Sequence, residues 1–536
     1  MSQLVECIVK LLVASIALIA LIALSRGRPA FFVQHRSRIL QGLTLLGALA
    51  YINFGGLHTD GTAWHLWDQY HYFVGSKYFP ELKYDGLYVA TIQARRETHP
   101  ELPPPARVRD LRSGELVPLA SVADHTAQVR SRFSDDRWQQ FSADVSRFYL
   151  RDDIFLDNGL KATPTHIQVL RLFSSWQPFR TRSIALVAML DFLLLGIGGY
   201  AVYRAFGLTT LAGVSLAFGI GFCSRYYWLG GAFLRHDWLV ALLLAAACLQ
   251  LGHIKSAAAA VAYASMVRIF PVLFVLPLVV YWLAKYRSGH SIRPLVAFSS
   301  VFALSAVSLF AVGWLGQPDA WPQSISGLIT HARTNFPNSV GLRIPFITGF
   351  ANLHGDLVNP STLYDYVDIS RDYARLLSAR LWLVILVTAI FVGLTLRAAW
   401  RAPTPAAAFV LGIALVFALT APTCYYGTFF ALLPLVRPVR STAVFLGASI
   451  CCYIAAALVL ALSNAGYLRL NGAAVFAPVS LFLAIALVDW LLHYPRQTAP
   501  IANHRPGDTH GDAIGDATLD RLGNLHGNAT RYADPI

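Results

Sequence analysis

The chain has 536 residues, of which 56% are hydrophobic and 13% are charged, with a formal net charge of +14. A soluble protein of this size carries about 25% charged residues, so the composition excludes an ordinary soluble enzyme. A nucleic-acid-binding protein gathers its positive charge on one surface, but here the basic residues fall in short connections between apolar segments. That placement is typical of the cytoplasmic loops of membrane proteins.

Apolar segments recur along the sequence, and many approach the length of about 20 residues that a helix needs to span a bilayer. We therefore predict an all-α polytopic membrane protein with about thirteen transmembrane helices. The predicted spans are residues 7–25, 39–55, 183–203, 208–224, 238–252, 256–268, 270–284, 295–314, 381–396, 405–421, 425–436, 442–463 and 473–492.

The first apolar segment, "CIVKLLVASIALIALIAL", begins at Cys7 and is similar to the core of a signal peptide. A small-residue cleavage site follows such a core in a signal peptide, whereas "SRGRP" follows here. We interpret the segment as a retained helix, so that residues 1–55 form two N-terminal transmembrane helices.

The basic connections indicate the orientation of the chain, because short cytoplasmic loops are enriched in Lys and Arg. They contain Arg26, Arg28, Arg36 and Arg38; Lys285, Arg287 and Arg293; Arg397 and Arg401; and Arg437 and Arg440. With these loops inside, the polar segments 56–182 and 315–380 face outward from a bundle that extends to residue 493. Helical spacing of apolar residues in the first segment predicts a helical extracytoplasmic loop. Residues 494–536 lack an apolar core and are predicted to be a disordered cytoplasmic tail.

The apolar stretch 256–284 is too long for one span, because a helix rises about 1.5 Å per residue and the hydrocarbon layer is about 30 Å thick. Arg268 and Pro271 also interrupt it. Proline removes a helical hydrogen bond, and an arginine at the bilayer centre costs about 2.5–3.5 kcal/mol or more. We predict two short helices that meet at the outer face.

The segment "WHLWDQYHYFVGSKYF", residues 64–79, places one carboxylate, Asp68, among aromatic side chains. If the segment is helical, Trp64, Asp68, His71 and Tyr72 share one face. The acid then lies beside an imidazole and a phenol at the membrane surface, as a general base could. The alternative is an aromatic anchor belt whose acid faces water. Asp60, in "HTDGT", is the competing acid.

Basic side chains recur in the outward turn "RYYWLGGAFLRHDW", residues 225–238. A Gly-rich turn with basic residues suits an anion such as a phosphate, although a loop solvated by lipid headgroups has the same composition. The turn contains Arg225, Arg235, His236 and Asp237. Arg268 would meet this turn at the outer face if the broken-helix prediction holds.

Two later segments add polar residues on the same side. The outer loop contains "HARTNFPNSVGLRIPF", which carries Arg343, and the turn "TAPTCYYGTFFALLP" carries Tyr425 and Tyr426. Asp191 lies inside the third predicted span, and the pattern assigns it no role.

Four pieces of the sequence together resemble the GT-C superfamily of membrane glycosyltransferases, and within it the polyprenol-phosphate-mannose-dependent glycosyltransferase family 87 and its bacterial relatives. They are "WDQYHYFVGSKYFPELKYDGLY" (67–88), "LRHDWLVALLLAAA" with "YASMVRIFPVLFVLPLVV" (234–280), "NFPNSVGLRIPF" (335–346) and "APTCYYGTFFALLPLV" (421–436). The chain departs from these relatives at "RHDW", where they often carry an amide-rich Gly-Gln-x-Asn turn.

The resemblance implies a GT-C-like bundle in the bacterial inner membrane, with its active site facing the periplasm. The enzyme would transfer a sugar from a polyprenyl-phosphate donor to a glycan, lipid or protein acceptor, with membrane lipids around it and no nucleic acid. Asp68 would be the general base. The donor phosphate would be bound by Arg235, His236, Arg268 and Arg343, and the substrates by His71, Tyr72, Asp60, Tyr425 and Tyr426. No metal cofactor is required by this chemistry, although a divalent metal is not excluded.

Two rival functions fit the same pattern. A lipid-linked sugar flippase or transporter also carries intramembrane charges and broken helices. A polysaccharide polymerase or ligase likewise combines many spans with basic outer loops. The sequence does not distinguish mannose from another hexose or a pentose.

Overall fold

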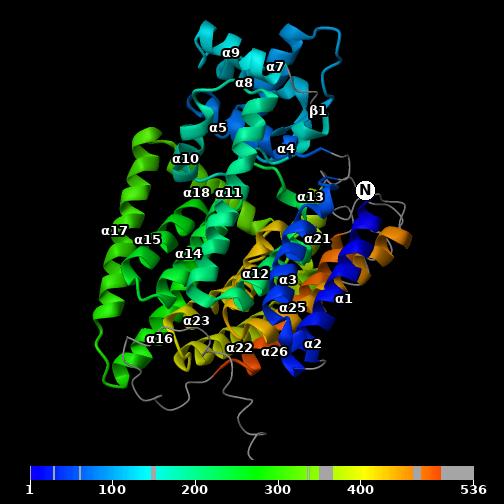
Figure 1. Ribbon diagram of the computed structural model, residues 1–536. Helices are drawn as coiled ribbons and strands as arrows, with labels where there is room; N and C mark the ends of the chain where they lie inside the picture. The colour runs from blue at the N-terminus through cyan, green and yellow to red at the C-terminus, as the bar shows by residue number, and fades with distance from the viewer. Residues whose placement is uncertain are drawn as a thin grey trace, which may run out of the picture. The chain divides into compact units, whose positions relative to one another are not determined.

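The computed structural model describes residues 2–27, 30–58, 62–146, 152–334, 336, 338–348, 366–462 and 472–495. Asp60 and the predicted disordered tail beyond residue 495 lie outside these residues. Within them the chain is mainly helical, as predicted for an all-α membrane protein (Figure 1). The N-terminal helices are α1 (Gln3–Arg26), α2 (Ala30–Gln34) and α3 (Arg36–Tyr51), with the turn η1 (Asn53–Gly55).

Short elements form the segment between α3 and the main bundle, and Figure 1 shows α7, α8 and α9 at one end of the long helices. They are α4 (Leu66–Gln69), η2 (Tyr70–Val74), α5 (Gly75–Lys77), α6 (Phe79–Leu82), α7 (Leu87–Thr98), β1 (Arg107–Asp110), β2 (Glu115–Pro118), η3 (Leu119–Val122), α8 (Ala123–Arg130), α9 (Asp135–Val145), η4 (Asp152–Leu156) and α10 (Pro164–Ser174).

The bundle that follows contains the long apolar helices. Its first half is α11 (Thr181–Phe206), α12 (Leu208–Ile220), η5 (Phe222–Ser224), α13 (Tyr226–Leu229), α14 (Asp237–Gln250), α15 (Ile254–Val267), η6 (Phe270–Phe274), α16 (Val275–Arg287) and α17 (Arg293–Gly316). The remaining elements are α18 (Ala320–Arg333), α19 (Ile344–Ile347), α21 (Tyr366–Ala379), α22 (Leu381–Trp400), α23 (Pro405–Val410), α24 (Gly412–Leu419), η8 (Cys424–Leu435), α25 (Pro438–Leu462), η10 (Gly472–Phe476) and α26 (Ala477–Leu492).

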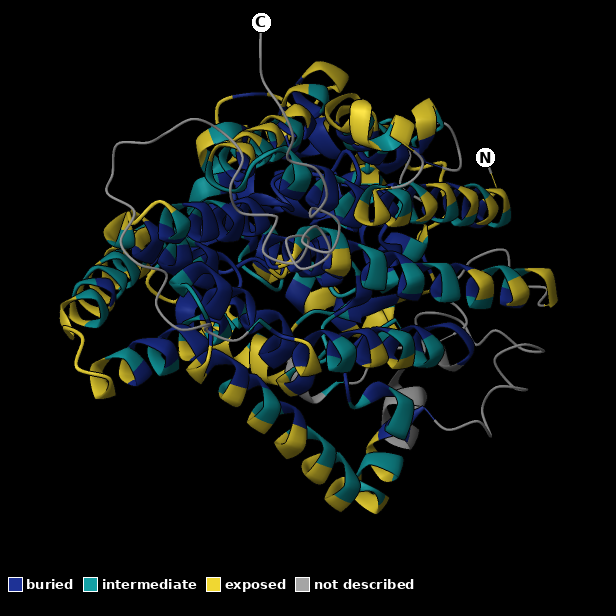
Figure 2. Ribbon diagram, turned by 60° about the horizontal axis from the view of Figure 1, so that its bottom comes forward, coloured by how far each residue is buried: buried dark blue, intermediate teal, exposed yellow. Residues whose placement is uncertain are grey.

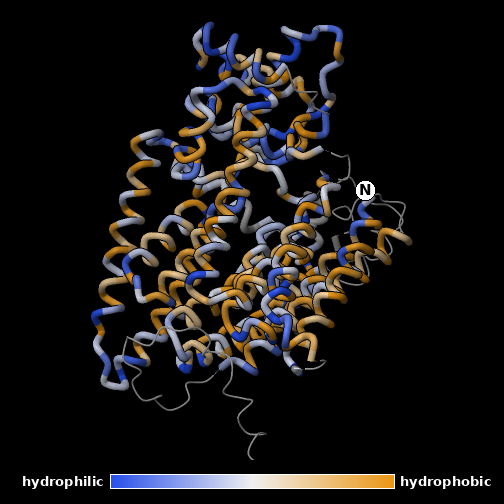
Figure 3. The backbone as a smooth tube through the Cα atoms, viewed as in Figure 1, coloured by the Kyte–Doolittle hydropathy of each residue, from blue (hydrophilic) through white to orange (hydrophobic). Residues whose placement is uncertain are grey.

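The bundle has the surface of a membrane protein. Apolar residues dominate the long helices in Figure 3, and in Figure 2 these helices expose their outer faces. On α17, Leu304 is 69% exposed and Val307 is 65% exposed. Large apolar patches of this kind are unfavourable in water but not in lipid. The apolar helices therefore indicate an integral membrane protein.

The predicted number of about thirteen spans is not confirmed. Within the described residues, seven helices are long and apolar enough to cross a membrane, or up to eight if the bent pair of α12 with residues 222–229 is one span. Each predicted span overlaps a helix among the described residues, but several of those helices are short. Helices α14 and α15 have 14 residues each and η8 has 12, against the length of about 20 that a span needs.

The predicted break between residues 256 and 284 is present. Helix α15 ends at Val267, and Arg268 has an extended backbone with φ −139° and ψ 121°. Pro271 lies in the first turn of η6, where a proline needs no amide hydrogen bond. The break leaves the side chain of Arg268 beside the end of a helix rather than along its lipid face.

The segment 56–182 is mainly helical, as predicted, but it also contains a two-stranded hairpin that the sequence pattern missed. Strands β1 and β2 pair antiparallel, with Arg107 opposite Pro118 and Asp110 opposite Glu115. The turn contains Gly114, whose φ of +79° is unfavourable for other residues. The strands are only four residues long, which is too short for alternation to stand out.

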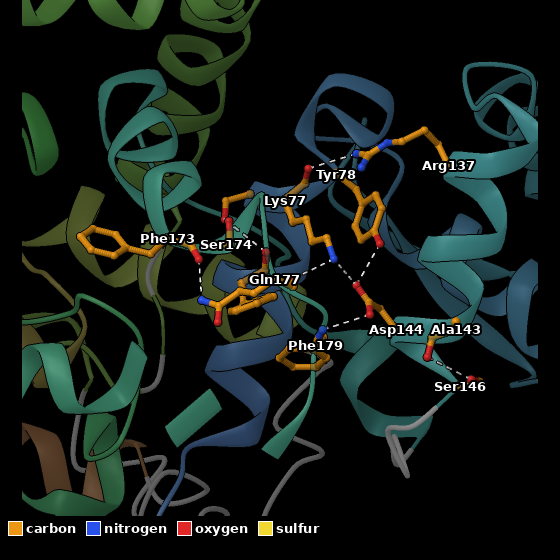
Figure 4. Close-up of polar contacts among 12 residues, drawn as sticks. Lys77, Tyr78, Arg137, Ala143, Asp144, Ser146, Phe173, Ser174, Gln177 and Phe179 are labelled. Atoms are coloured by element: carbon orange, nitrogen blue, oxygen red, sulfur yellow. Dashed lines mark hydrogen bonds and ion pairs between the residues drawn. The ribbon is translucent and has the colours of Figure 1, made fainter. Parts of the chain in front are cut away.

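A buried ion pair fastens this segment together and to the start of α11 (Figure 4). The ammonium of Lys77 donates to the Asp144 carboxylate at 2.7 Å and to the carbonyl of Gln177 at 2.9 Å. The Tyr78 hydroxyl donates to the same carboxylate oxygen at 2.9 Å, and the Phe179 amide donates to the other at 3.0 Å. The contacts join α5, α9 and the chain that leads into α11.

Candidate functional site

Three charged side chains from distant segments meet in one buried cluster. Arg235 donates from Nη1 to Asp68 Oδ1 at 2.5 Å. The guanidinium carbons of Arg235 and Arg268 lie 4.1 and 5.8 Å from the centre of the Tyr72 ring. Asp68, Arg235 and Arg268 are only 7%, 3% and 5% exposed. We call these three residues, with Tyr72, the Asp68 cluster.

Asp68 is held in place by the turn that carries Arg235. The amide of His65 and the side-chain amide of Gln69 both donate to the carbonyl of Gly231, each at 3.2 Å. Gly231 has φ +68°, and a Cβ there would lie 2.2 Å from the carbonyl oxygen of Ala63. Only glycine fits this approach, which brings α4 and the turn together.

The backbone of Arg235 is fixed by Asp191, the residue of α11 that the sequence left unassigned. The amides of Arg235 and His236 donate to the Asp191 carboxylate at 3.0 and 3.2 Å. A carboxylate beside the first amides of α14 is also favourable for the helix dipole. Leu234 has φ +49°, a strained value for a residue with a side chain. Asp191 thus orients the turn from which Arg235 reaches Asp68.

Arg268 is also contacted by a residue of α10. The Thr163 hydroxyl caps α10 and donates to the carbonyl of Met266 at 2.6 Å, which fastens the start of α10 to the end of α15. This brings His166 to Arg268, whose Nη1 donates to His166 Nδ1 at 3.0 Å.

Two tyrosines from the start of η8 complete the surroundings. The guanidinium carbon of Arg235 lies 5.5 Å from the Tyr425 ring centre, and that of Arg268 lies 5.8 Å from the Tyr426 ring centre. The Cys424 amide donates to the carbonyl of Asn338 at 2.8 Å, so the segment before α19 supports this turn. Aromatic rings next to buried guanidinium groups contribute cation–π attraction.

The polar atoms of the cluster are only partly used. Asp68 Oδ2, Arg235 Nε, and Arg268 Nε and Nη2 are buried and have no hydrogen-bond partner among the described residues. The Nε and Nη2 hydrogens of an arginine point the same way and can bind two oxygens of one anion. In Arg137 both atoms donate to Glu81, at 2.6 and 3.2 Å. Arg268 therefore offers a two-point anion site that no described residue fills.

The cluster places a proton acceptor beside two cationic groups. Its two guanidinium groups face one carboxylate, and the buried carboxylates of Asp191 and Asp237 lie close enough to act on Asp68 and Arg268, respectively. Burial raises the pKa of Asp68 to about 6, although Arg235 and Arg268 each act to lower it. A carboxyl group with this pKa accepts protons readily near neutral pH.

The structure brings Asp68, Arg235, Arg268, Tyr72 and the two tyrosines of η8 together as predicted, but it separates other predicted site residues. His236 faces Asp191, with Nδ1 3.1 Å from the carboxylate, because α11 packs behind the turn. His71 is used within its own segment, where its ring nitrogens bond the Trp67 carbonyl and the Tyr88 hydroxyl, both at 2.8 Å. The hydrogen bonds described for His236, predicted to bind the donor phosphate, and for His71, predicted to bind the substrates, therefore do not involve the Asp68 cluster.

Two further predicted residues do not join the cluster. Arg343 precedes α19, in a strip whose neighbours pair with the end of α24: the Leu342 amide donates to the Phe417 carbonyl at 2.9 Å. None of the contacts described for Arg343 reaches Asp68 or the cluster arginines. Asp60 lies outside the described residues.

Sequence reasoning missed His166, which touches Arg268, and did not assign Asp237, which lies behind it. Their contacts could not be found from spacing, because the partners lie far along the chain. The only local signal is "TPTH" at residues 163–166, where a helix cap and proline precede a histidine.

Comparisons of the chain with protein-family models, curated proteins and solved structures find no match.

Proposed function

We propose that this protein is an integral membrane glycosyltransferase that moves a sugar from a polyprenyl-phosphate donor to an acceptor hydroxyl. The observation that carries the proposal is the Asp68 cluster. Among the described residues, one buried oxygen of the Asp68 carboxylate has no hydrogen-bond partner, and neither do Nε of Arg235 or Nε and Nη2 of Arg268. Displacement of a phosphate by a hydroxyl needs both a proton acceptor and a cationic site for the leaving group.

The proposed reaction uses the two groups at the same moment. The acceptor oxygen forms a bond to the anomeric carbon of the sugar, and its proton passes to Asp68 Oδ2. The bond between that carbon and the phosphate oxygen breaks, and its electron pair leaves on the polyprenyl phosphate. Arg268, through Nε and Nη2, and Arg235, through Nε, stabilise the negative charge that develops there.

The contact between Asp68 and Arg235 supports different roles for the two oxygens of the Asp68 carboxylate. Oδ1 accepts from Arg235, which holds the group in one orientation, and Oδ2 has no partner among the described residues. Burial keeps the pKa of Asp68 at about 6, so the carboxylate is ionised at neutral pH yet is basic enough to take a proton. The aromatic rings of Tyr72, Tyr425 and Tyr426 would pack against the sugar or the prenyl chain.

The test follows transfer of radiolabelled sugar from polyprenyl-phosphate donors in membranes that contain the full chain. Asp68→Asn is compared with Asp152→Asn, whose carboxylate pairs with Arg95 at 2.7 Å on the surface. We expect loss of transfer in the first variant only. Full activity of Asp68→Asn would remove this residue as the base. Movement of lipid-linked sugar across vesicles without a new glycosidic bond would instead identify a flippase.

A further inference from the structure

We propose that His166 and Asp237 are positioning residues that aim the two-point anion site of Arg268, with His166 acting as a neutral imidazole between them. The inference rests on the proposed function, because it assumes that Arg268 binds the phosphate of the donor. It assigns a role to two buried residues that lie next to the Asp68 cluster and do not belong to it.

The geometry is a chain of four side chains. Tyr263 donates its hydroxyl to Asp237 Oδ2 at 2.7 Å, and the Trp238 amide donates to Oδ1 at 2.8 Å. His166 Nε2 lies 3.5 Å from Asp237 Oδ2, and Nδ1 accepts from Arg268 Nη1 at 3.0 Å. His166 is fully buried and Asp237 is 4% exposed, so neither group serves as a surface charge.

The contacts determine the tautomer of His166. A guanidinium can only donate, so Nδ1 must carry the lone pair that accepts from Arg268. The single ring hydrogen of the neutral imidazole is then on Nε2, which lies 3.5 Å from Asp237 Oδ2 and makes no hydrogen bond among the described residues. At this distance the buried carboxylate attracts the Nε2 hydrogen and so favours the tautomer whose Nδ1 accepts from Arg268.

The hydrogen bond from Arg268 to His166 is made by Nη1, which is not one of the two guanidinium atoms proposed to bind the phosphate. Nη1 donates to His166 and to the Val267 carbonyl, at 3.0 and 3.1 Å. Nε and Nη2 remain buried and without partners among the described residues. An arginine held along one edge keeps the opposite edge in a fixed direction, so less conformational freedom is lost when a phosphate binds.

The surroundings keep His166 neutral. The charged and titratable groups that face it are Arg268, Arg235, Asp237 and Tyr72. Burial, reinforced by the two arginines, keeps the pKa of His166 well below its usual range. A protonated ring would turn an N–H toward Arg268 and remove the acceptor on which the alignment depends.

The test uses three variants of the full chain in detergent, with farnesyl phosphate as the probe and intrinsic tryptophan fluorescence as the readout. His166→Asn places an amide oxygen where Nδ1 lies and keeps the acceptor. His166→Gln places its polar end at the position of Nε2 and loses that acceptor, while His166→Phe removes both contacts. We expect the Phe and Gln variants to bind about 10²-fold more weakly, as displacement of a positioned group can cost. We expect the Asn variant to stay within about fivefold of wild type.

Arg268→Gln separates this inference from the proposed function. If Arg268→Gln loses binding while His166→Gln and His166→Phe bind as wild type does, the positioning role is wrong and the anion site stands. If Arg268→Gln binds farnesyl phosphate normally, the anion site itself is wrong. Rescue by Asn but not by Gln, in proteins with equal melting temperatures, would not arise from a merely structural role for His166.

Discussion

Two buried ion pairs of this protein use the same kinds of side chain in different ways. In the Lys77–Asp144 pair both carboxylate oxygens have partners, since Lys77 and Tyr78 donate to Oδ2 and the Phe179 amide donates to Oδ1. In the Asp68–Arg235 pair Oδ1 accepts from the arginine, and Oδ2 is buried with no partner among the described residues.

The difference indicates which pair holds the fold and which is available for chemistry. A buried carboxylate with all its hydrogen bonds made orders the elements around it and has no capacity for a ligand. A buried polar atom without a partner costs free energy of folding, of the order of 1–3 kcal/mol. Persistence of several such atoms in one cluster is expected where a substrate supplies the missing contacts.

The arginines show the same contrast. Arg225, which the sequence grouped with Arg235, directs Nε and Nη2 at the two oxygens of Glu6 on α1. Lys10, one turn further along α1, donates to the carbonyl of Gly219 at 2.7 Å. These contacts anchor the first helix in the bundle. Arg268 presents the same two atoms to no described residue.

The largest expected effect is on activity. Asp68→Asn keeps an oxygen for Arg235 and places its amide where Oδ2 has no partner among the described residues. Arg235 loses its counter-charge, so the free energy of unfolding should fall by about 3–5 kcal/mol. Sugar transfer should fall by about 10²–10⁴-fold, because the general base is lost. Initial rates of labelled transfer and thermal unfolding of the same sample measure both. Equal rates for wild type and variant would count against the base.

The same substitution in the other pair should lower stability without lowering transfer. In Asp144→Asn the amide group must face a donor, either the Phe179 amide or Lys77 and Tyr78, and Lys77 loses its counter-charge. We expect the free energy of unfolding to fall by about 3–5 kcal/mol. Transfer per folded molecule should stay close to wild type. Thermal unfolding in detergent and the active fraction measure these two quantities, and an unchanged melting temperature would contradict the structural role.

Arg268→Lys tests the two-point anion site. Lysine keeps the charge but cannot donate two parallel hydrogen bonds, so we expect transfer to fall by about 10²-fold. The matched control is Arg137→Lys, which loses its paired contact with Glu81 in the segment 56–182. If both variants lose activity equally at equal stability, the site is not specific to Arg268.

The pH dependence follows from the pKa of Asp68, which burial raises to about 6. Transfer should increase about tenfold per pH unit below about 6 and level off above it, because only the ionised carboxylate accepts a proton. The effect on stability has the opposite sign. Since the folded state holds this proton more tightly, its contribution is present below about 4 and is lost as the pH rises through about 6. If the transfer rate of Asp68→Asn falls below about pH 6 as steeply as that of wild type, Asp68 is not the group whose ionisation controls transfer.

The smallest effect is expected at the surface. Asp152→Asn breaks the pair with Arg95, in which the carboxylate is half exposed. Solvent already screens this pair, so the free energy of unfolding should change by less than about 1 kcal/mol and transfer should not change. A larger loss would show that the contrast between the two buried pairs reflects general sensitivity to charge removal.

Much of the architecture follows from the sequence alone. Runs of apolar residues predict where helices lie, because a backbone in lipid must make its hydrogen bonds within the segment. The break beside Arg268 and Pro271 follows from the proline and the cost of a charge in lipid. The pattern also drew attention to Asp68, Arg235 and Arg268, since polar side chains next to apolar runs need an explanation.

The tertiary structure decided which partner each charged residue meets. Four titratable residues lie close together in sequence between 225 and 237, but each contacts a different part of the chain. Arg225 contacts Glu6, Arg235 contacts Asp68, His236 contacts Asp191 and Asp237 contacts Tyr263. These partners lie 219, 167, 45 and 26 positions away along the chain. Spacing reports only neighbours within a turn or two of one helix. Whether a charge is fully paired or left with donors for a ligand depends on how separate helices pack.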